Sequence, residues 1–443
     1  MKSFALTLIA LTLGAMSPAA AAGMSHPRES GIALEGRINS PYIASRGGRA
    51  YLQLTIVTPE RGVRERKPVN LCVVLDRSGS MAEQGKIGNA KAALNALIDQ
   101  LNEDDIFSLV IYDDVVDVLR PACRVEDKAG LRDLVEGIGP RGWTNLGGGM
   151  REGFRQVEKH AGGATVNRVV LLSDGLANRG VTDPSHLGRL AREHRGHSVS
   201  LTTIGVGLDY NENLMTSLAD QGGGNYYFIE CAGDLASILR KEFDMLGCVV
   251  AQDAVIELKP GRGVRVADVI GGELVAGDGK VRIPVGDLYA GERREFTVEL
   301  DLPGGIGREV VASGVLRYDP AGVIAGGSFS ASVTYTGDAA EIDHYRDWGA
   351  QSKADIAVST RGVEKAMNAL DAGRKDEAVT EIAAARQALR ASPSASQAGV
   401  GAAVMAQEQR LGVYQERVAE SAGDARKAKK AIQYDNYNVQ KKK

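Results

Sequence analysis

The segment between residues 69 and 248 alternates short apolar runs with stretches of helical periodicity. The apolar runs have the length and composition of buried strands and cover 71–76, 106–112, 115–119, 168–173, 198–206 and 226–230. Helices are expected between them, at about 86–101, 127–137, 147–160, 184–194, 211–221 and 233–246. Strands that alternate with helices predict a mainly parallel sheet covered by helices on both faces, which is a doubly wound α/β domain.

Strand-like segments lie on both sides of this α/β domain. Residues 23–68 and 249–337 contain apolar alternation interrupted by turn sequences, which is typical of an all-β sandwich. The ends of an inserted domain usually lie close together. The two parts therefore form either one sandwich in which the α/β domain is inserted, or two small β modules that precede and follow it.

Residues 338–443 have the pattern of an α-helical region. Residues 366–389 predict two helices joined by DAGRKDE, and a loop at 391–399 leads to a last helix at about 400–432. The end of the chain, KKAIQYDNYNVQKKK, is polar and basic. This composition predicts a solvated, frayed tail.

The start of the chain has the composition of a targeting segment. Lys2 precedes an apolar stretch that ends in small residues at 19–22, which predicts a secretory signal peptide over residues 1–22 and a secreted or periplasmic protein. The four cysteines allow up to two disulfides in an oxidising compartment. Cys72, inside an apolar run, is expected to be a buried free thiol. No later apolar run is long enough to predict a membrane span.

Polar side chains follow the apolar runs at the points where strands should end. Asp76 closes the run LCVVLD, Ser78 and Ser80 come directly after it, Thr144 precedes a helix, and Asp174 follows a second buried run. The carboxyl ends of parallel strands meet at one edge of a sheet. Hydroxyl and carboxylate oxygens are hard ligands that suit Mg²⁺, Ca²⁺ or Mn²⁺ better than zinc. The sequence therefore predicts a divalent-cation site at this edge.

The order D-x-S-x-S, Thr, Asp over residues 69–248 resembles the metal-ion-dependent adhesion site (MIDAS) of von Willebrand factor A (VWA) domains, which have a Rossmann-like fold. The outer regions resemble, more weakly, exported bacterial proteins with an A domain and inter-alpha-trypsin-inhibitor-type proteins. The resemblance implies that Ser78, Ser80 and Thr144 bind Mg²⁺ through their hydroxyls. It implies that Asp76 and Asp174 act through water or orient the hydroxyls.

The resemblance also implies a partner, namely a protein that supplies an Asp or Glu carboxylate to the open position of the ion. Loops 77–86, 141–147 and 174–181 should surround the ion, with Arg77, Trp143 and Asn178 as candidate contacts on the rim. Gly147 to Gly149 either allow this loop to shift on binding or are ordinary turn glycines. The chain is thus expected to be an exported, metal-dependent adhesion module. The alternative is an envelope structural or assembly factor in which the metal only stabilises loops.

Other classes of function are disfavoured. The net charge of −3 argues against nucleic acid as the main partner. Neither a phosphate-binding G-x-x-x-x-G-K-[ST] motif nor the zinc-protease motif H-E-x-x-H occurs, and we expect no enzyme activity. His194 and His197 are interpreted as a surface helix end, because no further soft ligand lies nearby. The pairs 104–105 and 113–114 are interpreted as solvated turn aspartates.

Overall fold

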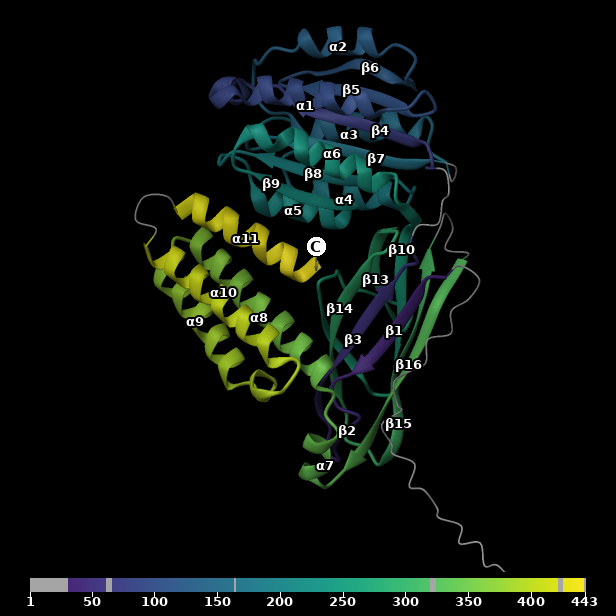
Figure 1. Ribbon diagram of the computed structural model, residues 1–443, viewed down its shortest axis with the longest axis vertical. Coiled ribbons are helices and arrows are strands. Elements are labelled where there is room, and N and C mark those ends of the chain that lie inside the picture. The colour runs from purple at the N-terminus through teal and green to yellow at the C-terminus, as the bar shows by residue number, and fades with distance from the viewer. Residues whose placement is uncertain (1–30, 61–65, 163–164, 319–323, 421–424, 442–443) are drawn as a thin grey trace, which may run out of the picture.

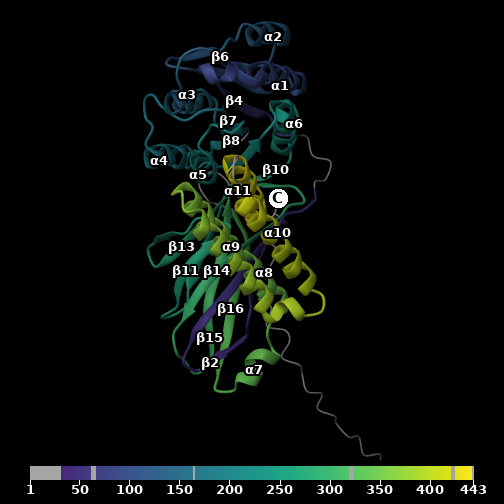
Figure 2. The ribbon, with the colours of Figure 1, turned by 90° about the vertical axis from the view of Figure 1, so that its left-hand side faces the viewer.

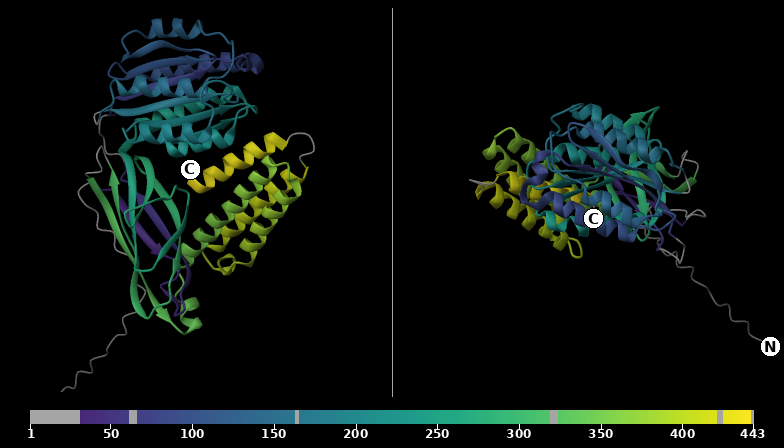
Figure 3. Two further views of the ribbon diagram at one scale, coloured as in Figure 1. Left: turned by 180° about the vertical axis from the view of Figure 1, so that it is seen from behind. Right: turned by 90° about the horizontal axis from the view of Figure 1, so that it is seen from above.

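The structure, a computed structural model, describes residues 31–60, 66–162, 165–318, 324–420 and 425–441 (Figure 1). The predicted signal peptide lies outside these residues. The described part has three regions, which are an α/β domain, a β-sandwich and a helical region. Figures 2 and 3 show the α/β domain stacked on one end of the sandwich, with the helical region beside both.

The α/β domain is built on a six-stranded sheet with the order β6-β5-β4-β7-β8-β9. Its strands are β4 (Val69–Asp76), β5 (Ile106–Tyr112), β6 (Val116–Arg124), β7 (Val166–Ser173), β8 (Ser200–Val206) and β9 (Gly223–Ile229). Only the β5–β6 pair among them is antiparallel. Every residue of β4 and β7 is buried, as expected for the centre of a sheet covered on both faces.

Six helices cover the two faces of this sheet. They are α1 (Lys86–Gln100), α2 (Lys128–Glu136), α3 (Leu146–Glu158), α4 (Pro184–Arg195), α5 (Glu212–Gln221) and α6 (Leu235–Leu246). One apolar core contains side chains of α1, α2 and α6, and a second contains side chains of α3, α4 and α5. The predicted fold class, a doubly wound α/β domain with a β-sandwich and a C-terminal helical region, is confirmed.

The sandwich consists of two sheets that combine strands from both sides of the α/β domain. One sheet has the order β1-β3-β14-β11, and the other has the order β12-β13-β10-β15-β16-β2. Their strands are β1 (Ala33–Ile38), β2 (Tyr42–Ala44), β3 (Gly48–Val57), β10 (Val249–Pro260), β11 (Arg265–Ile270), β12 (Val275–Gly277), β13 (Lys280–Tyr289), β14 (Arg293–Leu302), β15 (Gly307–Tyr318) and β16 (Ile324–Thr336). β3 pairs with β14 from Gly48↔Leu302 to Val57↔Arg293, so the purple strands lie among green ones in Figure 1. The α/β domain is therefore inserted between β3 and β10 of one sandwich.

A buried ionic network joins the α/β domain to the sandwich. Arg168 of β7 is fully buried, and it donates hydrogen bonds to Glu242 Oε1 of α6 at 2.9 Å and to Asp287 Oδ2 of β13 at 2.7 Å. A guanidinium keeps its proton in a protein interior, and buried charges are tolerated only when they are paired. The three charges therefore hold the two domains in one relative position.

The helical region contains α7 (Ala339–His344), α8 (Trp348–Asp371), α9 (Lys375–Ala391), α10 (Gly401–Glu420) and α11 (Ala425–Lys441). The predicted pair of helices around DAGRKDE is present as α8 and α9. The predicted single last helix is wrong, because residues 401–441 form two helices, α10 and α11. α11 lies between the bundle and the α/β domain, where it contacts α8 and β9 (Figure 1).

The predicted frayed tail is also wrong, because α11 is packed against the α/β domain. Lys429 and Lys430 are 8% and 2% exposed, and both ammonium groups contact the carboxylate of Glu212 at the start of α5. Lys430 Nζ also donates to the Tyr210 carbonyl oxygen at 2.7 Å. Lys429 and Lys430, whose charges predicted a solvated tail, are thus the residues that attach α11 to the α/β domain.

Two further predictions concern membranes and cysteines. Among the described helices, none combines the length and the apolar composition needed to cross a bilayer. Cys72, Cys123 and Cys231 carry free thiols, so the two disulfides that the sequence allowed are not formed. Cys72 is fully buried on β4, as expected, and burial raises the pKa of its thiol to about 12.

Candidate functional site

The structure brings the five predicted metal-site residues to the carboxyl edge of the sheet. β4 and β7 are parallel neighbours with Leu75 opposite Leu172, so Asp76 and Asp174 leave the sheet side by side. Ser78 Oγ and Ser80 Oγ lie 3.1 Å apart. Ser80 Oγ donates a hydrogen bond of 2.7 Å to Asp174 Oδ1.

Thr144 reaches the same place from the loop before α3. Its backbone N–H donates to Asn178 Oδ1 at 2.9 Å, and its carbonyl oxygen accepts from the Asn178 N–H at 3.2 Å. Gly175 has no side chain and leaves room between the loop that carries Thr144 and the loop that carries Ser80. A Cβ atom on Gly175 would lie 3.4 Å from Thr144 Oγ1 and 3.6 Å from Ser80 Oγ. The hydroxyls of Thr144 and Ser80 therefore border one small space that the missing side chain keeps open.

Asp76 is fully buried and is held by hydrogen bonds from its own loop and from β7. Its Oδ1 accepts from the Ser78 N–H at 2.8 Å, and its Oδ2 accepts from Ser173 Oγ at 2.8 Å and from the Tyr112 hydroxyl at 3.3 Å. Burial raises the pKa of the Asp76 carboxyl to about 6, although the hydrogen bonds from Ser78 and Ser173 act in the opposite direction. These hydrogen bonds agree with the expected role of Asp76, in which its carboxylate orients the loop that carries Ser78.

Lys86 is a residue of this site that the sequence analysis missed. Its Nζ lies 2.6 Å from Asp174 Oδ2, and the two side chains are 3% and 0% exposed. Lys86 is the first residue of α1 and continues the buried face formed by Ala90, Leu94 and Leu97. The sequence did contain a signal for Lys86, because this lysine is aligned with the apolar face of its helix. When such a face is buried, the lysine charge must be paired with an opposite charge.

The donor set fits a divalent cation. Oxygen ligands at neighbouring positions of an octahedral Mg²⁺ ion lie about 2.9 Å apart, given bonds of about 2.0–2.1 Å. The 3.1 Å separation of Ser78 Oγ and Ser80 Oγ is close to this value. The nearby charges are two carboxylates, of Asp76 and Asp174, and one ammonium, of Lys86. The neutral hydroxyls and the net negative charge of the nearby side chains suit a hard cation.

The three predicted rim residues differ in their placement. Trp143 is 61% exposed, as a contact residue should be. Asn178 is exposed, but its amide oxygen is used to hold Thr144. Arg77 is mostly buried, because its guanidinium pairs with Asp113 at 2.8 Å and with Asp117 at 2.5 Å. Arg77 is therefore a residue that fixes the loop and not a contact on the open rim.

Two exposed apolar side chains on the rim were not predicted. Leu176 is 56% exposed on the loop after β7, and Val115 is 53% exposed on the turn after β5. This turn is linked to the Trp143 loop, because the Trp143 N–H donates to the Asp114 side-chain oxygen Oδ1 at 3.3 Å. Val115, Trp143 and Leu176 thus lie on three loops at the carboxyl edge of the sheet that also carries the candidate cation site, and we call them the apolar collar.

Other expectations for charged residues near the edges of the sheet need correction. Asp105 and Asp113, predicted to be solvated, are 0% and 1% exposed. Asp105 pairs with Arg66 and accepts from the Val69 N–H at 2.8 Å, whereas Asp113 pairs with Arg77 and Arg141. Each carboxylate secures a segment that enters or leaves the sheet. Asp104 and Asp114 are exposed, as expected.

The glycines after Thr144 do not form a loose turn. They belong to α3, and a Cβ on Gly147 would lie 2.6 Å from the Val181 carbonyl oxygen. A Cβ on Gly149 would lie 2.6 Å from the Tyr112 ring. Both glycines are required for close packing of α3, and neither alternative considered from the sequence describes them.

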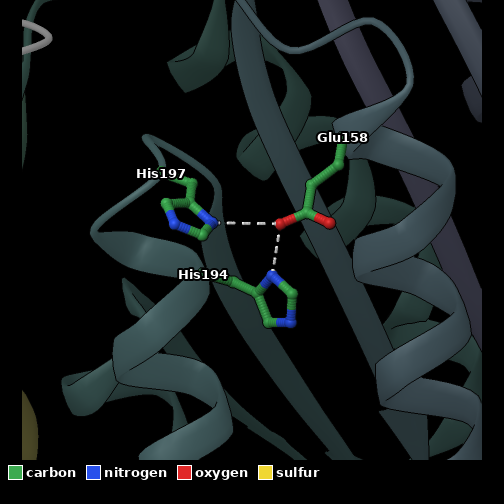
Figure 4. Close-up of side chains that lie close together, drawn as sticks. All are labelled: Glu158, His194 and His197. Carbon is green, nitrogen blue, oxygen red and sulfur yellow. Dashed lines mark hydrogen bonds and ion pairs between the residues drawn. The ribbon is translucent and has the colours of Figure 1, made fainter.

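His194 of α4 and His197, which follows this helix, also have a neighbour that the sequence did not reveal. Glu158, the last residue of α3, lies between His194 and His197 (Figure 4). Glu158 is a carboxylate and not a soft ligand, so it adds a hard oxygen to the two imidazoles. The contact joins residues that are 36 and 39 positions apart.

Comparison with known families identifies the class of the α/β domain. Residues 70–241 match the family model of the von Willebrand factor type A domain. Together with the doubly wound sheet and the D-x-S-x-S loop at its carboxyl edge, this match shows that the α/β domain is a VWA domain. VWA domains commonly mediate protein interactions and often bind a divalent metal.

More than half of the chain aligns with bacterial relatives, and a solved structure has a similar fold. It is 29% identical over 279 residues to the uncharacterized protein YfbK of Escherichia coli (strain K12), an alignment that covers 61% of this chain and 48% of YfbK. The chain thus spans about half the length of that relative. The structure of von Willebrand factor type A from Catenulispora acidiphila is similar with a TM-score of 0.70 and 18% identity, over 94% of this chain and 97% of that one. This likeness covers the VWA domain, the sandwich and the helical region, and it shows a shared fold.

A mammalian relative matches a shorter segment. The inter-alpha-trypsin inhibitor heavy chain H3 of Mus musculus is 27% identical over 165 residues, which are 35% of this chain and 18% of that protein.

Proposed function

We propose that this chain is an exported protein-binding module whose VWA domain holds Mg²⁺ and captures an Asp or Glu side chain of a protein partner. Asp76, Ser78, Ser80, Thr144 and Asp174 would hold the ion, and Ca²⁺ or Mn²⁺ would fit the same oxygen ligands. One observation carries the proposal, namely the convergence of these oxygen-bearing groups at the carboxyl edge of the sheet. Export rests on the signal peptide predicted for residues 1–22.

The chemistry follows from the charge of the ligands. A divalent cation held through neutral hydroxyls keeps much of its positive charge and attracts a carboxylate to its open position. Ser78, Ser80 and Thr144 supply such hydroxyls, and the hydrogen bonds of Asp76 and Asn178 keep two of the loops in position. The chain itself thus provides an ordered half of a coordination sphere at its surface.

The apolar collar would supply the affinity that a single carboxylate contact lacks. Water competes for an open position on a cation, so contacts around the ion are needed to hold a partner. Trp143, Leu176 and Val115 are 61%, 56% and 53% exposed, and large exposed apolar side chains grouped at one place mark interaction surfaces. An aromatic anchor beside a charged contact is a common arrangement at the centre of an interface.

The alternative, in which the ion only stabilises loops, is less well supported by the contacts. The Lys86 ammonium already compensates Asp174, and Asn178 already holds the Thr144 loop through side-chain and backbone hydrogen bonds. The loops therefore have protein partners that do not require an ion. We also propose that the chain has no enzyme activity, since the site is built for binding.

The first part of the test measures the ion. Titration calorimetry with Mg²⁺ should give one site, and Thr144→Ala should weaken it by tenfold or more. Ser237→Ala is the matched control, because it removes a surface hydroxyl of α6 that donates to the Asp234 carbonyl oxygen at 2.7 Å. Equal Mg²⁺ affinity in Thr144→Ala and the unmutated protein would refute the site.

The second part measures the partner chemistry. Peptides displayed on phage are selected on the protein in Mg²⁺ and eluted with EDTA. We expect the selected peptides to share an Asp or Glu whose replacement by the amide abolishes binding. Trp143→Ala should weaken these peptides tenfold or more while Mg²⁺ affinity stays the same. Peptides that bind equally well in EDTA, or without an acidic residue, would contradict the proposed mechanism and leave the structural role.

A further inference from the structure

A cluster of metal-ligating side chains lies at the opposite edge of the VWA sheet. α3 begins beside Thr144 at the carboxyl edge and ends at Glu158, and the chain then returns to the start of β7. His194 is in the last turn of α4, and His197 follows in the turn before β8. The cluster is thus separated from the predicted MIDAS by the length of a helix, and it is independent of the proposed function.

The ligand atoms of this cluster converge. His194 Nδ1 lies 2.5 Å from Glu158 Oε1, and His197 Nδ1 lies 3.3 Å from the same oxygen (Figure 4). One ligand atom from each residue lies within 4.8 Å of the other two. The side chains of Glu158, His194 and His197 are 33%, 14% and 62% exposed. The site is therefore ordered on one side and open to solvent on the other.

The backbone and a neighbouring ring fix the two imidazoles. The His197 N–H donates to the His194 carbonyl oxygen at 3.0 Å, and Ser198 has a positive φ of 60°, so the chain turns back directly after α4. This turn places both histidines on the side that faces α3. The His194 ring is stacked on the buried Phe154 ring, with centroids 4.1 Å apart and planes at 15°. Such stacking holds the His194 ring plane while its Nδ1 points to Glu158.

We propose that Glu158, His194 and His197 form a second metal site, which binds Zn²⁺ or a similar transition-metal ion. Two imidazole nitrogens and one carboxylate oxygen with an open fourth position suit zinc, whereas hydroxyl and carboxylate oxygens suit Mg²⁺. Ligand atoms around a tetrahedral zinc lie about 3.3 Å apart, given bonds of about 2.0–2.1 Å. The His197–Glu158 distance of 3.3 Å already has this value, and a small movement of the Glu158 side chain would open the shorter His194 contact.

The proposed ion has a defined structural consequence. It would join the last residue of α3 to the turn between α4 and β8, two segments that lie on the same face of the sheet. In its absence the two imidazoles share one carboxylate oxygen through hydrogen bonds. A metal site and a hydrogen-bonded cluster can be distinguished by experiment, because hydrogen bonds alone would give these three residues no affinity for Zn²⁺.

The experiment measures Zn²⁺ affinity by competition with a chromophoric chelator, in saturating Mg²⁺ so that the oxygen site is filled. The full chain should bind one Zn²⁺ at this site, and His197→Ala should weaken it at least 30-fold. Glu158→Gln should weaken it at least tenfold. His186→Ala is the matched control, because it removes an exposed histidine from the first turn of α4, the helix that carries His194, and it should have no effect.

A second measurement guards against a loss of folding in the variants. His197 is 62% exposed, so its replacement should leave the melting temperature without metal unchanged. Co²⁺ should give visible absorption bands of a low-coordinate site in the unmutated protein and in Thr144→Ala, and the bands should be absent in His197→Ala. Equal Zn²⁺ affinity in His197→Ala and His186→Ala, or Co²⁺ bands that persist in His197→Ala, would overturn the proposal.

Discussion

Replacement of Lys86 by Met tests how the candidate cation site is balanced electrostatically. Lys86 Nζ lies 2.6 Å from Asp174 Oδ2, and neither side chain is more than 3% exposed. Removing one partner of a buried ion pair leaves the other charge uncompensated and costs about 3–5 kcal/mol. We therefore expect Lys86→Met to lower the free energy of unfolding by about that amount in EDTA, measured by urea unfolding at pH 7.

Magnesium should reduce this loss, because the Lys86 ammonium and a bound cation are both positive neighbours of Asp174. A ligand that binds only the native state adds about 2.7 kcal/mol at a concentration of one hundred times its Kd. Without the repulsion from Lys86, the variant should bind Mg²⁺ more tightly than the unmutated protein. By linkage, each tenfold gain in affinity corresponds to about 1.4 kcal/mol of extra stabilisation under saturating Mg²⁺.

Two variants serve as controls for this prediction. Lys91→Met removes a lysine from the same helix whose Nζ contacts the Glu136 carbonyl oxygen at the surface, and it should cost less than about 1 kcal/mol. The double variant Lys86→Met/Asp174→Asn removes both charges and should be more stable in EDTA than Lys86→Met alone. An equal loss of stability for Lys86→Met in EDTA and in Mg²⁺ would show that Lys86 and the ion do not share Asp174.

Three further predictions concern pH, thiols and the domain junction. Because the pKa of Asp76 is raised to about 6 and a cation favours the carboxylate, Mg²⁺ affinity in titration calorimetry should fall as the pH decreases from 7.5 to 5; a flat profile would contradict this. At pH 8, a thiol reagent should modify the exposed Cys231 in the native protein, whereas Cys72, with a pKa of about 12, should react only after unfolding. Arg168→Met should lower the free energy of unfolding by about 3–5 kcal/mol in urea titrations, because it leaves two buried carboxylates unpaired, and a loss below 1 kcal/mol would refute this account.

The elements of the VWA domain were predictable because their apolar residues carry local periodicity. The run that became β4 was placed within two residues of its observed start, and α1 within one residue of its observed end. The same holds for the order of the site residues, since Asp76 and Asp174 each follow a buried run directly. In a parallel sheet this local position is sufficient to bring them to one edge.

Several of the errors share one physical cause, which is that charged residues are buried by partners distant in sequence. Lys430 resembled a solvated residue, but its partner Glu212 is 218 positions away. Asp105 and Arg77 were placed in solvent for the same reason. The sequence shows that a residue carries a charge, and only the fold shows whether an opposite charge meets it.

The position of α11 gives a physical reason for the helical region to be attached to the VWA domain. Lys430 binds the Tyr210 carbonyl oxygen and Glu212 on one side of the segment that follows β8. In the same segment, a Cβ on Gly207 would lie 3.5 Å from Lys86 Nζ, the atom that pairs with Asp174. Two buried ammonium groups thus lie beside the same short segment, one from the helical region and one from the candidate site. Because a fixed segment limits where the Lys86 side chain can lie, α11 supports the arrangement of charges around Asp174 without contacting it.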